Sequence, residues 1–330
     1  MVLGHSQGCH ISVQYIMTKT TKLIAHSIVA VLFGSAMTLA CADEVQKVPA
    51  VAKKKSGKVR AVAVADFGRD GGPNLLSHAA FVFDQETGRA LYAKNAENAV
   101  PIASITKLMT SMVVLDAKLN LDEAVVIDKV DKDMLKGSKS RLPVGTAFRR
   151  EDLMRLALMA SDNRAAAALG RTYPGGTEVF VEAMNAKAKL LGLNNAHFVD
   201  PTGLAPGNVA SPQDLAVMVS AASAYPEIRE FSTAQALSVT LPASSRQIGF
   251  VNTNALVRSD GWSIGLSKTG YINEAGKCLV MQAIIASRPV VIVLMDSWGK
   301  FTRIGDANRI KKWIESGKVA VLPVKVASPS

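Results

Sequence analysis

The segment from Ser104 to about Lys118 carries the pattern that most restricts how this chain can fold. Apolar side chains recur there three and four residues apart, at Ile105, Leu108, Met109, Met112 and Val113. This spacing is the period of an α-helix that buries one face. We therefore expect a helix from Ser104 to about Lys118 that is embedded in a core and holds Ser104 at its N-terminal tip, near the positive end of the helix dipole.

Ser104 and Lys107 lie three positions apart, so on a helix their side chains share one face. A neutral lysine amine within reach of the serine hydroxyl could accept its proton and turn the oxygen into a useful nucleophile. The same S-x-x-K spacing also arises by chance. In the simpler interpretation, Ser104 caps the helix and Lys107 lies in solvent.

Two further stretches favour the catalytic interpretation. Ser161-Asp162-Asn163 follows the apolar run from Leu153 to Ala160, and Lys268-Thr269-Gly270 precedes Tyr271. In this order, S-x-x-K, S-x-N and K-T-G are the signature set of penicillin-binding proteins and serine β-lactamases.

The residues around the motifs extend the resemblance. Val100-Pro101-Ile102-Ala103 leads into the first motif, and Asp200-Pro201-Thr202-Gly203-Leu204 follows the second. From about Leu75 to about Gly317 the chain resembles the low-molecular-mass penicillin-binding proteins, which are the D-alanyl-D-alanine endopeptidases and carboxypeptidases of peptidase family S11. The resemblance implies hydrolysis of D-alanyl bonds in peptidoglycan peptide stems and covalent inhibition by β-lactam antibiotics.

The resemblance also assigns catalytic roles. Ser104 would be the nucleophile that forms an acyl-enzyme and Lys107 its base, while Ser161 would relay a proton to the leaving amine. The amide of Asn163 could hold Lys107 and also bind the substrate backbone. An exposed lysine is mostly charged at neutral pH, so we expect Lys107 to be largely buried, with Lys268 as a second cation on the other side of Ser104.

The third motif is expected to bind the substrate. Lys268 and Thr269 would lie on a strand lining the cleft, where the equivalent groups of the family bind the terminal carboxylate of the donor peptide or drug. Gly270 would leave space for the substrate against that strand. The resemblance implies an oxyanion hole made by the backbone N–H groups of Ser104 and Tyr271.

Periodicity and turn residues along the rest of the chain predict an α+β fold. The run from Ala79 to Phe83, a turn, and the run from Arg89 to Tyr92 predict a β-hairpin. Helices are expected at 150–169 with an interruption near Ser161, and at 177–191, 211–224 and 306–316. Strands are expected at 251–257, 279–286 and 290–295, the last of them central. This order fits a central antiparallel sheet flanked by helices, with an all-helical lobe, which is also the β-lactamase/D,D-peptidase-like fold of the resembled family.

The N-terminus has the order of a signal peptide. Lys19 and Lys22 precede an apolar stretch at 23–39, and Ala40-Cys41-Ala42 is a small-residue cleavage site. We expect residues 1–42 to be removed on export to the periplasm, with 1–16, ahead of Met17, as an over-called start. A retained membrane anchor and lipidation at Cys41 are the alternatives, although the apolar stretch is shorter than the roughly twenty residues of a spanning helix.

The remaining boundaries follow from composition. Residues 43–74 contain lysines, small residues and turn residues and predict a flexible linker, 75–317 form the catalytic domain, and 318–330 form a C-terminal tail. After cleavage Cys278 would be the single cysteine, so the fold would depend on its core and not on a disulfide. The net charge of +11 suits polyanionic cell-wall polymers or serves solubility, and an exported protein rarely meets nucleic acid.

No cofactor or metal is implied. His78 and His197 stand alone without metal-ligand spacing, and we find no phosphate-binding or dinucleotide motif.

Among the functions that remain, we expect a periplasmic D,D-peptidase. The chain ends soon after its last helix without an anchor pattern, which favours an endopeptidase over a carboxypeptidase. A β-lactamase is the second alternative, for which Glu182 to Asn185 has the spacing of a deacylating glutamate motif but lies inside an amphipathic helix. A non-catalytic wall-binding protein is the third, and it would predict a broken motif set.

Overall fold

The computed structural model describes residues 65–68, 71–241 and 245–319 of the 330-residue chain. The expected signal peptide, most of the expected linker and nearly all of the expected tail lie outside the described residues. Phe67 and Pro73 form an isolated β-bridge ahead of the first strand. Among the described residues, no helix combines the length and the apolar character that a membrane crossing requires.

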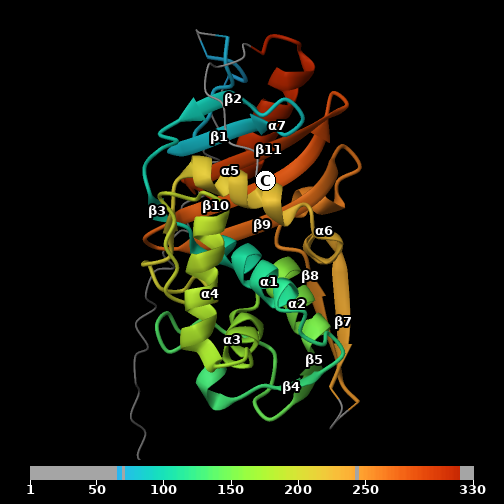
Figure 1. Ribbon diagram of the computed structural model, residues 1–330. Coiled ribbons are helices and arrows are strands. Elements are labelled where there is room, and N and C mark those ends of the chain that lie inside the picture. The colour runs from blue at the N-terminus through green and yellow to red at the C-terminus, as the bar shows by residue number, and fades with distance from the viewer. Residues whose placement is uncertain (1–64, 69–70, 242–244, 320–330) are drawn as a thin grey trace, which may run out of the picture. The chain divides into compact units, whose positions relative to one another are not determined.

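A five-stranded antiparallel sheet has the order β2-β1-β11-β10-β9 (Figure 1). Its strands are β1 (Ala79–Asp84), β2 (Arg89–Lys94), β9 (Ser263–Ile272), β10 (Gly276–Ile285) and β11 (Arg288–Ser297). β1 and β2 form the predicted hairpin, and β11 is the predicted central strand. Strand β9, which carries the third motif, lies at the edge of the sheet, so alternate backbone groups of β9 face away from β10.

Helices cover both faces of this sheet. Helix α7 (Thr302–Glu315) packs against β10 and β11, where Trp313 joins Leu279 and Ile292 in one apolar cluster. Helix α5 (Pro212–Ala222) packs against β1, β10 and β11 on the opposite face, and Figure 1 shows the other helices gathered beyond it. Because apolar side chains of β11 point into both clusters, the strand is buried on both sides.

The helical lobe confirms the predicted helices with small changes at their ends. Ser211 caps α5 by accepting a hydrogen bond from the Asp214 backbone N–H (3.0 Å), with Pro212 in the first turn, as its sequence suggests. The predicted interruption near Ser161 separates two helices. The other helices are α1 (Lys107–Asp116), α2 (Arg150–Met159), α3 (Asn163–Arg171), α4 (Gly176–Leu190) and α6 (Pro226–Thr233).

Two sequence predictions are wrong in detail. The α-helix does not start at Ser104, because a 3₁₀ turn, η1 (Ala103–Thr106), precedes α1. The strand expected at 251–257 ends at Val251. Asn252 Oδ1 then accepts a hydrogen bond from the backbone N–H of Asn254 (3.0 Å), and Asn254 caps the 3₁₀ turn η3 (Ala255–Arg258). Asparagine side chains that bond to nearby backbone in this way favour turns over strands.

Short pairs of strands complete the fold. β3 (Val100–Pro101) pairs with β6 (Val209–Ala210) beside the first motif. In the helical lobe, β4 (Ala124–Val126) pairs with β5 (Ala147–Arg149), and the 3₁₀ turn η2 (Lys129–Asp131) lies between them. β7 (Ala236–Thr240) and β8 (Gln247–Val251) form a separate hairpin.

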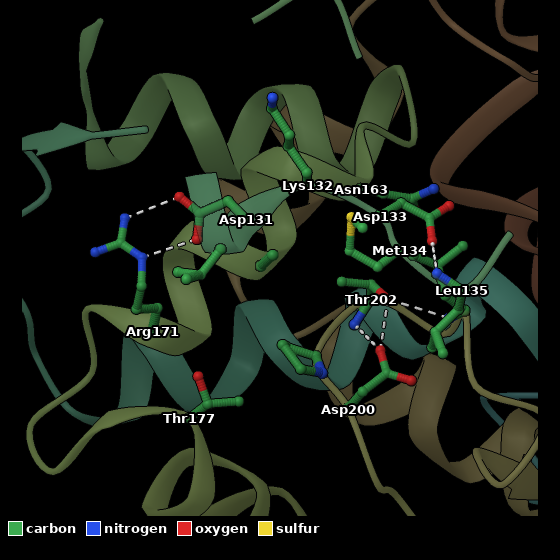
Figure 2. Close-up of a pocket in the computed structure, with 14 residues that line it drawn as sticks. Asp131, Lys132, Asp133, Met134, Leu135, Asn163, Arg171, Thr177, Asp200 and Thr202 are labelled. Atoms are coloured by element: carbon green, nitrogen blue, oxygen red, sulfur yellow. Dashed lines mark hydrogen bonds and ion pairs between the residues drawn. The ribbon is translucent and has the colours of Figure 1, made fainter. Parts of the chain in front are cut away.

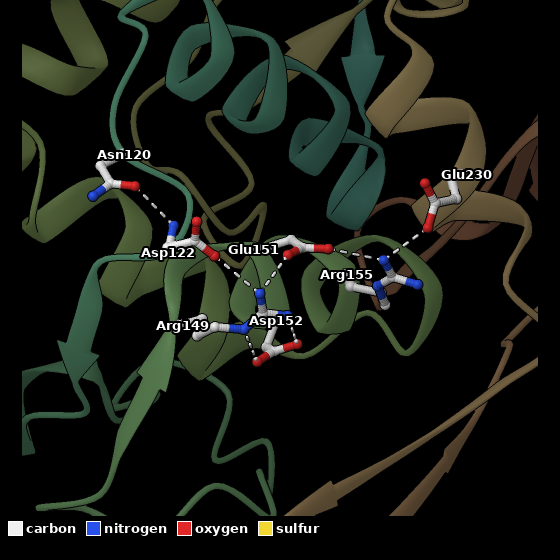
Figure 3. A network of polar contacts seen from close by, with 7 residues as sticks. All are labelled: Asn120, Asp122, Arg149, Glu151, Asp152, Arg155 and Glu230. Atoms are coloured by element: carbon white, nitrogen blue, oxygen red, sulfur yellow. Dashed lines mark hydrogen bonds and ion pairs between the residues drawn. The ribbon is translucent and has the colours of Figure 1, made fainter.

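Ion pairs surround the start of α2 (Figure 3). Arg149 lies close to three carboxylates, and Arg155 bridges Glu151 of α2 to Glu230 of α6. All of these side chains are in contact with solvent, some only partly, so each pair adds little stability. Arg150 differs, because its side chain is buried and donates hydrogen bonds to Glu123 (2.7 Å) and Thr172 (2.9 Å).

Candidate active site

Ser104 lies in a tight turn that two glycines make possible. Ala103, the residue before it, has a left-handed backbone with a φ of 49°. A Cβ atom on Gly203 would stand 1.9 Å from the carbonyl oxygen of Ala103, and one on Gly270 would stand 3.2 Å from the backbone nitrogen of Ser104. Two distant segments therefore approach the turn more closely than a larger residue would allow, and they fix the position of the serine.

Lys107 is fully buried, as predicted. Its Nζ donates hydrogen bonds to Ser104 Oγ (2.7 Å), Asn163 Oδ1 (2.7 Å) and the carbonyl oxygen of Thr202 (2.6 Å). Three acceptors match the three hydrogens of the ammonium form. The amine is therefore held in one place against the serine hydroxyl.

Burial lowers the pKa of Lys107 from 10.5 to about 7. The carboxylates of Asp200, Asp162 and Asp133 oppose this change, because each favours the charged amine. Desolvation prevails because burial removes the water that stabilises an ammonium. At neutral pH about half of the molecules therefore carry a neutral amine beside Ser104.

A second serine–lysine pair lies nearby. Ser161 has a left-handed backbone (φ 58°) in the turn between α2 and α3. Lys268 Nζ, buried on β9, donates to Ser161 Oγ (2.8 Å) and to the carbonyl oxygen of Thr269 (2.8 Å). Thr269 Oγ1 is hydrogen-bonded to Thr253 Oγ1 at 2.7 Å. The structure therefore joins the second and third motifs directly, through Ser161 and Lys268.

The pKa of Lys268 also lies well below its ordinary value. Burial is the main cause, followed by repulsion from Lys107 and from Arg303. Lys107 thus lowers the pKa of Lys268 by repulsion. The lowered pKa of Lys107, in contrast, is due to burial and not to Lys268. Because two buried ammonium groups repel each other, the site favours states with a single positive charge on the pair.

The carbonyl of Thr202 is held in place by its own loop. Asp200 Oδ1 accepts hydrogen bonds from the backbone N–H of Thr202 (2.6 Å) and of Gly203 (2.8 Å), and Asp200 Oδ2 accepts one from Ala205 (3.0 Å). Asn208 Nδ2 donates to the Asp200 carbonyl (2.9 Å). The flanking sequence from Asp200 to Leu204 therefore forms a rigid cradle for the amine of Lys107.

Asn163 and Asp162 of the second motif make different contacts. Asn163 accepts from Lys107 and donates from Nδ2 to Ser138 Oγ (2.8 Å). Asp162 points elsewhere: it caps α3 through the Ala165 backbone N–H and accepts from Ser140 Oγ (2.8 Å). Asn163 is therefore oriented from both ends of its amide, with its oxygen toward the lysine.

Sequence reasoning missed four groups at this site. They are the Thr202 carbonyl, Ser138, Thr253 and Arg303, whose guanidinium donates to the backbone carbonyls of Gly270 (3.3 Å) and Cys278 (3.1 Å). The Asp200–Leu204 flank was the available signal for Thr202. Ser138 and Thr253 lie in loops and Arg303 lies at the start of α7, and none of them belongs to a motif. They reach the site only through contacts between segments that are far apart in the sequence.

Two cavities open beside Asn163. The larger, about 380 Å³, lies among the loop after η2, helix α3 and the Asp200–Leu204 segment. In Figure 2 the Asp131–Arg171 ion pair lies at one end of it, and Asp200 bonded to Thr202 lies at the other. The smaller, about 300 Å³, lies between Ser138 and the end of β9. Asn163 and Leu204 line both, so both cavities adjoin the amide that accepts from Lys107.

A serine held by a buried lysine of near-neutral pKa, with a second serine–lysine pair beside it, is an arrangement that can activate a serine hydroxyl without histidine. Among the described residues, no group of three or more His, Cys, Asp and Glu side chains could hold a metal ion. The two serine–lysine pairs are the arrangement of the serine–lysine class of acyl-transfer enzymes.

Comparisons with known proteins give the family. Residues 68–299 match the family model of D-alanyl-D-alanine carboxypeptidase, peptidase family S11. The D-alanyl-D-alanine endopeptidase of Pseudomonas aeruginosa is 47% identical over 249 residues, which cover 76% of this chain and 80% of that protein. The D-alanyl-D-alanine endopeptidase of Escherichia coli is 45% identical over 256 residues, covering 78% of this chain and 83% of that protein.

Solved structures agree with the sequence comparison. The DD-transpeptidase of Streptomyces K15 superposes with a TM-score of 0.69 at 30% identity, covering 73% of this chain and 98% of that one. This chain belongs to peptidase family S11. It is a serine-type D-alanyl-D-alanine peptidase with the predicted α+β, penicillin-binding-protein fold.

Proposed function

We propose that this protein cleaves D-alanyl cross-links of peptidoglycan in the periplasm, as an endopeptidase that forms an acyl-enzyme on Ser104. One observation carries the proposal: Lys107 is buried, has a pKa of about 7 and lies 2.7 Å from Ser104 Oγ. The two relatives named endopeptidases, at 47% and 45% identity, support cross-links as the substrate.

The neutral form of Lys107 is the reactive form. It keeps two N–H groups, which suffice for Asn163 Oδ1 and the Thr202 carbonyl, and its lone pair then faces Ser104 Oγ. The hydrogen bond between Lys107 and Ser104 thereby reverses, and the hydroxyl becomes the donor. Ser104 is then poised to lose its proton as it attacks a carbonyl carbon.

Acylation forms one bond and breaks another. Ser104 Oγ bonds to the D-alanyl carbonyl carbon while its proton moves to Lys107 Nζ. The backbone N–H groups of Ser104 and of Tyr271, on the edge strand β9, would stabilise the negative oxygen of the tetrahedral intermediate. The C–N bond then breaks, and the leaving amine takes a proton that comes from Lys107 through Ser161.

Ser161 is suited to this relay. Its oxygen accepts a hydrogen bond from Lys268, so its own hydrogen remains available for the leaving nitrogen. In deacylation, water attacks the ester carbon and gives its proton to Lys107, and the proton returns to Ser104 Oγ. The cycle ends with the free enzyme and a new carboxylate on the donor peptide.

Lys268 and Arg303 make one end of the site positive. Both are at least half-buried, and Arg303 lies on the carbonyl of Gly270. We assign the carboxylate of the leaving D-amino acid to this end, with Thr269 Oγ1 as a further donor. The acyl part of the substrate then lies toward Asn163 and Tyr271.

The proposal extends to the whole chain. Residues 1–42 direct export, 43–74 form a linker, 75–317 form the catalytic domain, and 318–330 form a tail. β-Lactam antibiotics would acylate Ser104 and inhibit the enzyme. Mass measurement of the N-terminus of protein secreted into the periplasm tests the cleavage after Ala42, and an uncleaved or lipidated N-terminus contradicts it.

The central experiment combines labelling with digestion. Ser104→Ala should abolish labelling by a fluorescent penicillin, while Ser316→Ala, at the end of α7, should label normally. Persistent labelling of Ser104→Ala excludes Ser104 as the nucleophile.

Digestion of purified muropeptides by the unmodified enzyme distinguishes the candidate activities. Loss of cross-linked dimers supports the endopeptidase. Loss of one D-Ala from pentapeptides indicates a carboxypeptidase instead, and rapid turnover of nitrocefin indicates a β-lactamase.

A further inference from the structure

Three exposed aromatic side chains belong to the end of the sheet where β9 and β11 finish and β10 begins. Tyr271, Trp298 and Phe301 are 56%, 82% and 70% exposed. Among the other aromatic side chains of the described residues, Phe67 is the most exposed, at 38%. Large apolar side chains that gather in solvent are characteristic of a surface that binds a ligand or a partner.

Strand pairing brings two of these residues close together. Lys277, at the start of β10, pairs with Tyr271 of β9 on one side and with Ser297 of β11 on the other. Neighbouring strands lie about 4.8 Å apart, so the backbone of Ser297 is about 10 Å from that of Tyr271. Trp298 follows Ser297 directly, so it lies at the same end of the sheet.

The segment that carries Phe301 is fastened to the same strands. Arg303, two residues further on, donates hydrogen bonds to the backbone carbonyls of Gly270 (3.3 Å) and Cys278 (3.1 Å). These carbonyls belong to β9 and β10, each one residue away from the pair that Tyr271 forms with the start of β10. The three rings, which we call the aromatic platform (Tyr271, Trp298 and Phe301), are therefore anchored beside the strand that carries the third motif.

Two lysines accompany the aromatic platform. Lys277 Nζ lies 4.9 Å from the centre of the Tyr271 ring, and Lys300 Nζ lies 5.4 Å from the centre of the Phe301 ring. Neither ammonium group forms an ion pair with a carboxylate of the described residues, so both can donate hydrogen bonds to a ligand. The surface thus combines flat apolar rings with cationic donors.

Sugar rings match this combination. The face of a pyranose ring presents C–H groups, whose weakly positive hydrogens pack against the negative face of an aromatic ring. The hydroxyl and acetamido oxygens at the edge of an N-acetylated sugar accept hydrogen bonds from ammonium groups. Both kinds of contact are available at the aromatic platform and its lysines.

We propose that the aromatic platform binds N-acetylated sugar rings of the glycan strand that carries the donor peptide stem. This inference rests on the proposed function, which lays the acyl part of the substrate toward Tyr271 and thereby directs the rest of the stem toward the platform. An anionic membrane surface also attracts aromatic rings and lysines. The position of the platform, beside the residue whose backbone N–H is assigned to the oxyanion hole, favours an extension of the substrate over a membrane.

Two cross-linked muropeptide dimers test the proposal. One dimer keeps its N-acetylated disaccharides, and the other has lost them through cleavage of the bond between sugar and peptide. The quantity to measure is kcat/KM for each dimer, in the unmodified enzyme and in Trp298→Ala and Phe301→Ala. Phe67→Ala is the matched control, because it also removes an exposed ring with a lysine, Lys318, beside it (5.8 Å).

The variants should lose only the part of the specificity that depends on sugar. The unmodified enzyme should prefer the dimer that carries sugars, and Trp298→Ala and Phe301→Ala should each lower kcat/KM for that dimer about fivefold. Both should cleave the sugar-free dimer and react with penicillin as the unmodified enzyme does. Trp298→Tyr, which keeps a ring, should retain most of the preference, and Phe67→Ala should retain all of it.

Other outcomes overturn the aromatic platform as a sugar site. An unchanged ratio between the two dimers in Trp298→Ala and Phe301→Ala does so, and so does an equal loss on both dimers. Binding of Ser104→Ala to phosphatidylglycerol vesicles that Trp298→Ala abolishes, with no change in the ratio, would assign the platform to a membrane instead.

The failure of the proposed function is recognised separately. An unmodified enzyme that cleaves neither dimer, although penicillin labels it, overturns cross-links as the substrate. Sedimentation with insoluble peptidoglycan then still tests the aromatic platform, because it requires no cleavage. Ser104→Ala should sediment with the polymer more than S104A/W298A does, and equal sedimentation overturns the inference.

Discussion

Raising the pH from about 6 to about 8 should accelerate acylation of Ser104 about tenfold. The pKa of Lys107 is about 7, so the neutral amine accounts for about a tenth of the molecules at the lower pH and about nine tenths at the higher. Because the base must be neutral to accept the serine proton, the rate follows this fraction and levels off above pH 8. An ordinary lysine, with its pKa of 10.5, would give a rise of about a hundredfold without a plateau.

The assay is the rate of covalent labelling by a fluorescent penicillin in single-turnover conditions. His78→Gln and His197→Gln serve as controls and should leave the midpoint in place. A rate that still climbs tenfold per pH unit above pH 9 would falsify the assignment of a half-neutral Lys107.

A single carboxylate provides a second perturbation of the same profile. Asp133 favours the charged form of Lys107, so Asp133→Asn should move the midpoint to lower pH. Asp152→Asn, in the surface network of Figure 3, should not move it. A midpoint that moves to higher pH in Asp133→Asn contradicts this electrostatic account.

Two further predictions concern stability, measured by thermal or denaturant unfolding. Gly203→Ala should lower the free energy of unfolding by at least about 2 kcal/mol and reduce penicillin labelling, because its Cβ would clash with the Ala103 carbonyl and its φ is +81°. The control Gly192→Ala, with φ +69° and open space around it, should lose less stability and label normally. Arg150→Met should cost about 2 kcal/mol because it removes the hydrogen bonds that the buried guanidinium donates to Glu123 and Thr172. Arg149→Met, at a more exposed neighbouring position, should have a much smaller effect, and equal losses would contradict the burial argument.

Local patterns sufficed to predict much of this fold. The β1–β2 hairpin, the central strand β11 and the break between α2 and α3 follow from apolar periodicity and turn residues that act over a few positions. The strand expected at 251–257 failed because its alternating pattern contains Asn252 and Asn254. The side-chain oxygen of each accepts a hydrogen bond from the backbone N–H two residues further on and turns the chain, a local competition that periodicity alone does not register.

The motifs predicted the principal contacts of Lys107, but not the whole site. Ser104 and Asn163 were expected partners, and both are found at 2.7 Å. The Thr202 carbonyl, 95 residues along the chain, was not expected: the Asp200–Leu204 flank marked the segment, but not which of its backbone oxygens meets the lysine. Arg303 was missed for a similar reason, since its nearness to Gly270 depends on how α7 docks on the sheet.

The wide separation of the catalytic groups along the chain has a practical consequence. Lys107 and Asn163 are 56 residues apart, and Ser161 and Lys268 are 107 apart. In a partly folded molecule Ser104 is therefore present but not activated. Lys107 becomes buried and gains its partners only after the sheet and the helical lobe have docked. Penicillin labelling thus counts native molecules, and the chain acquires its activated serine only when folding is complete.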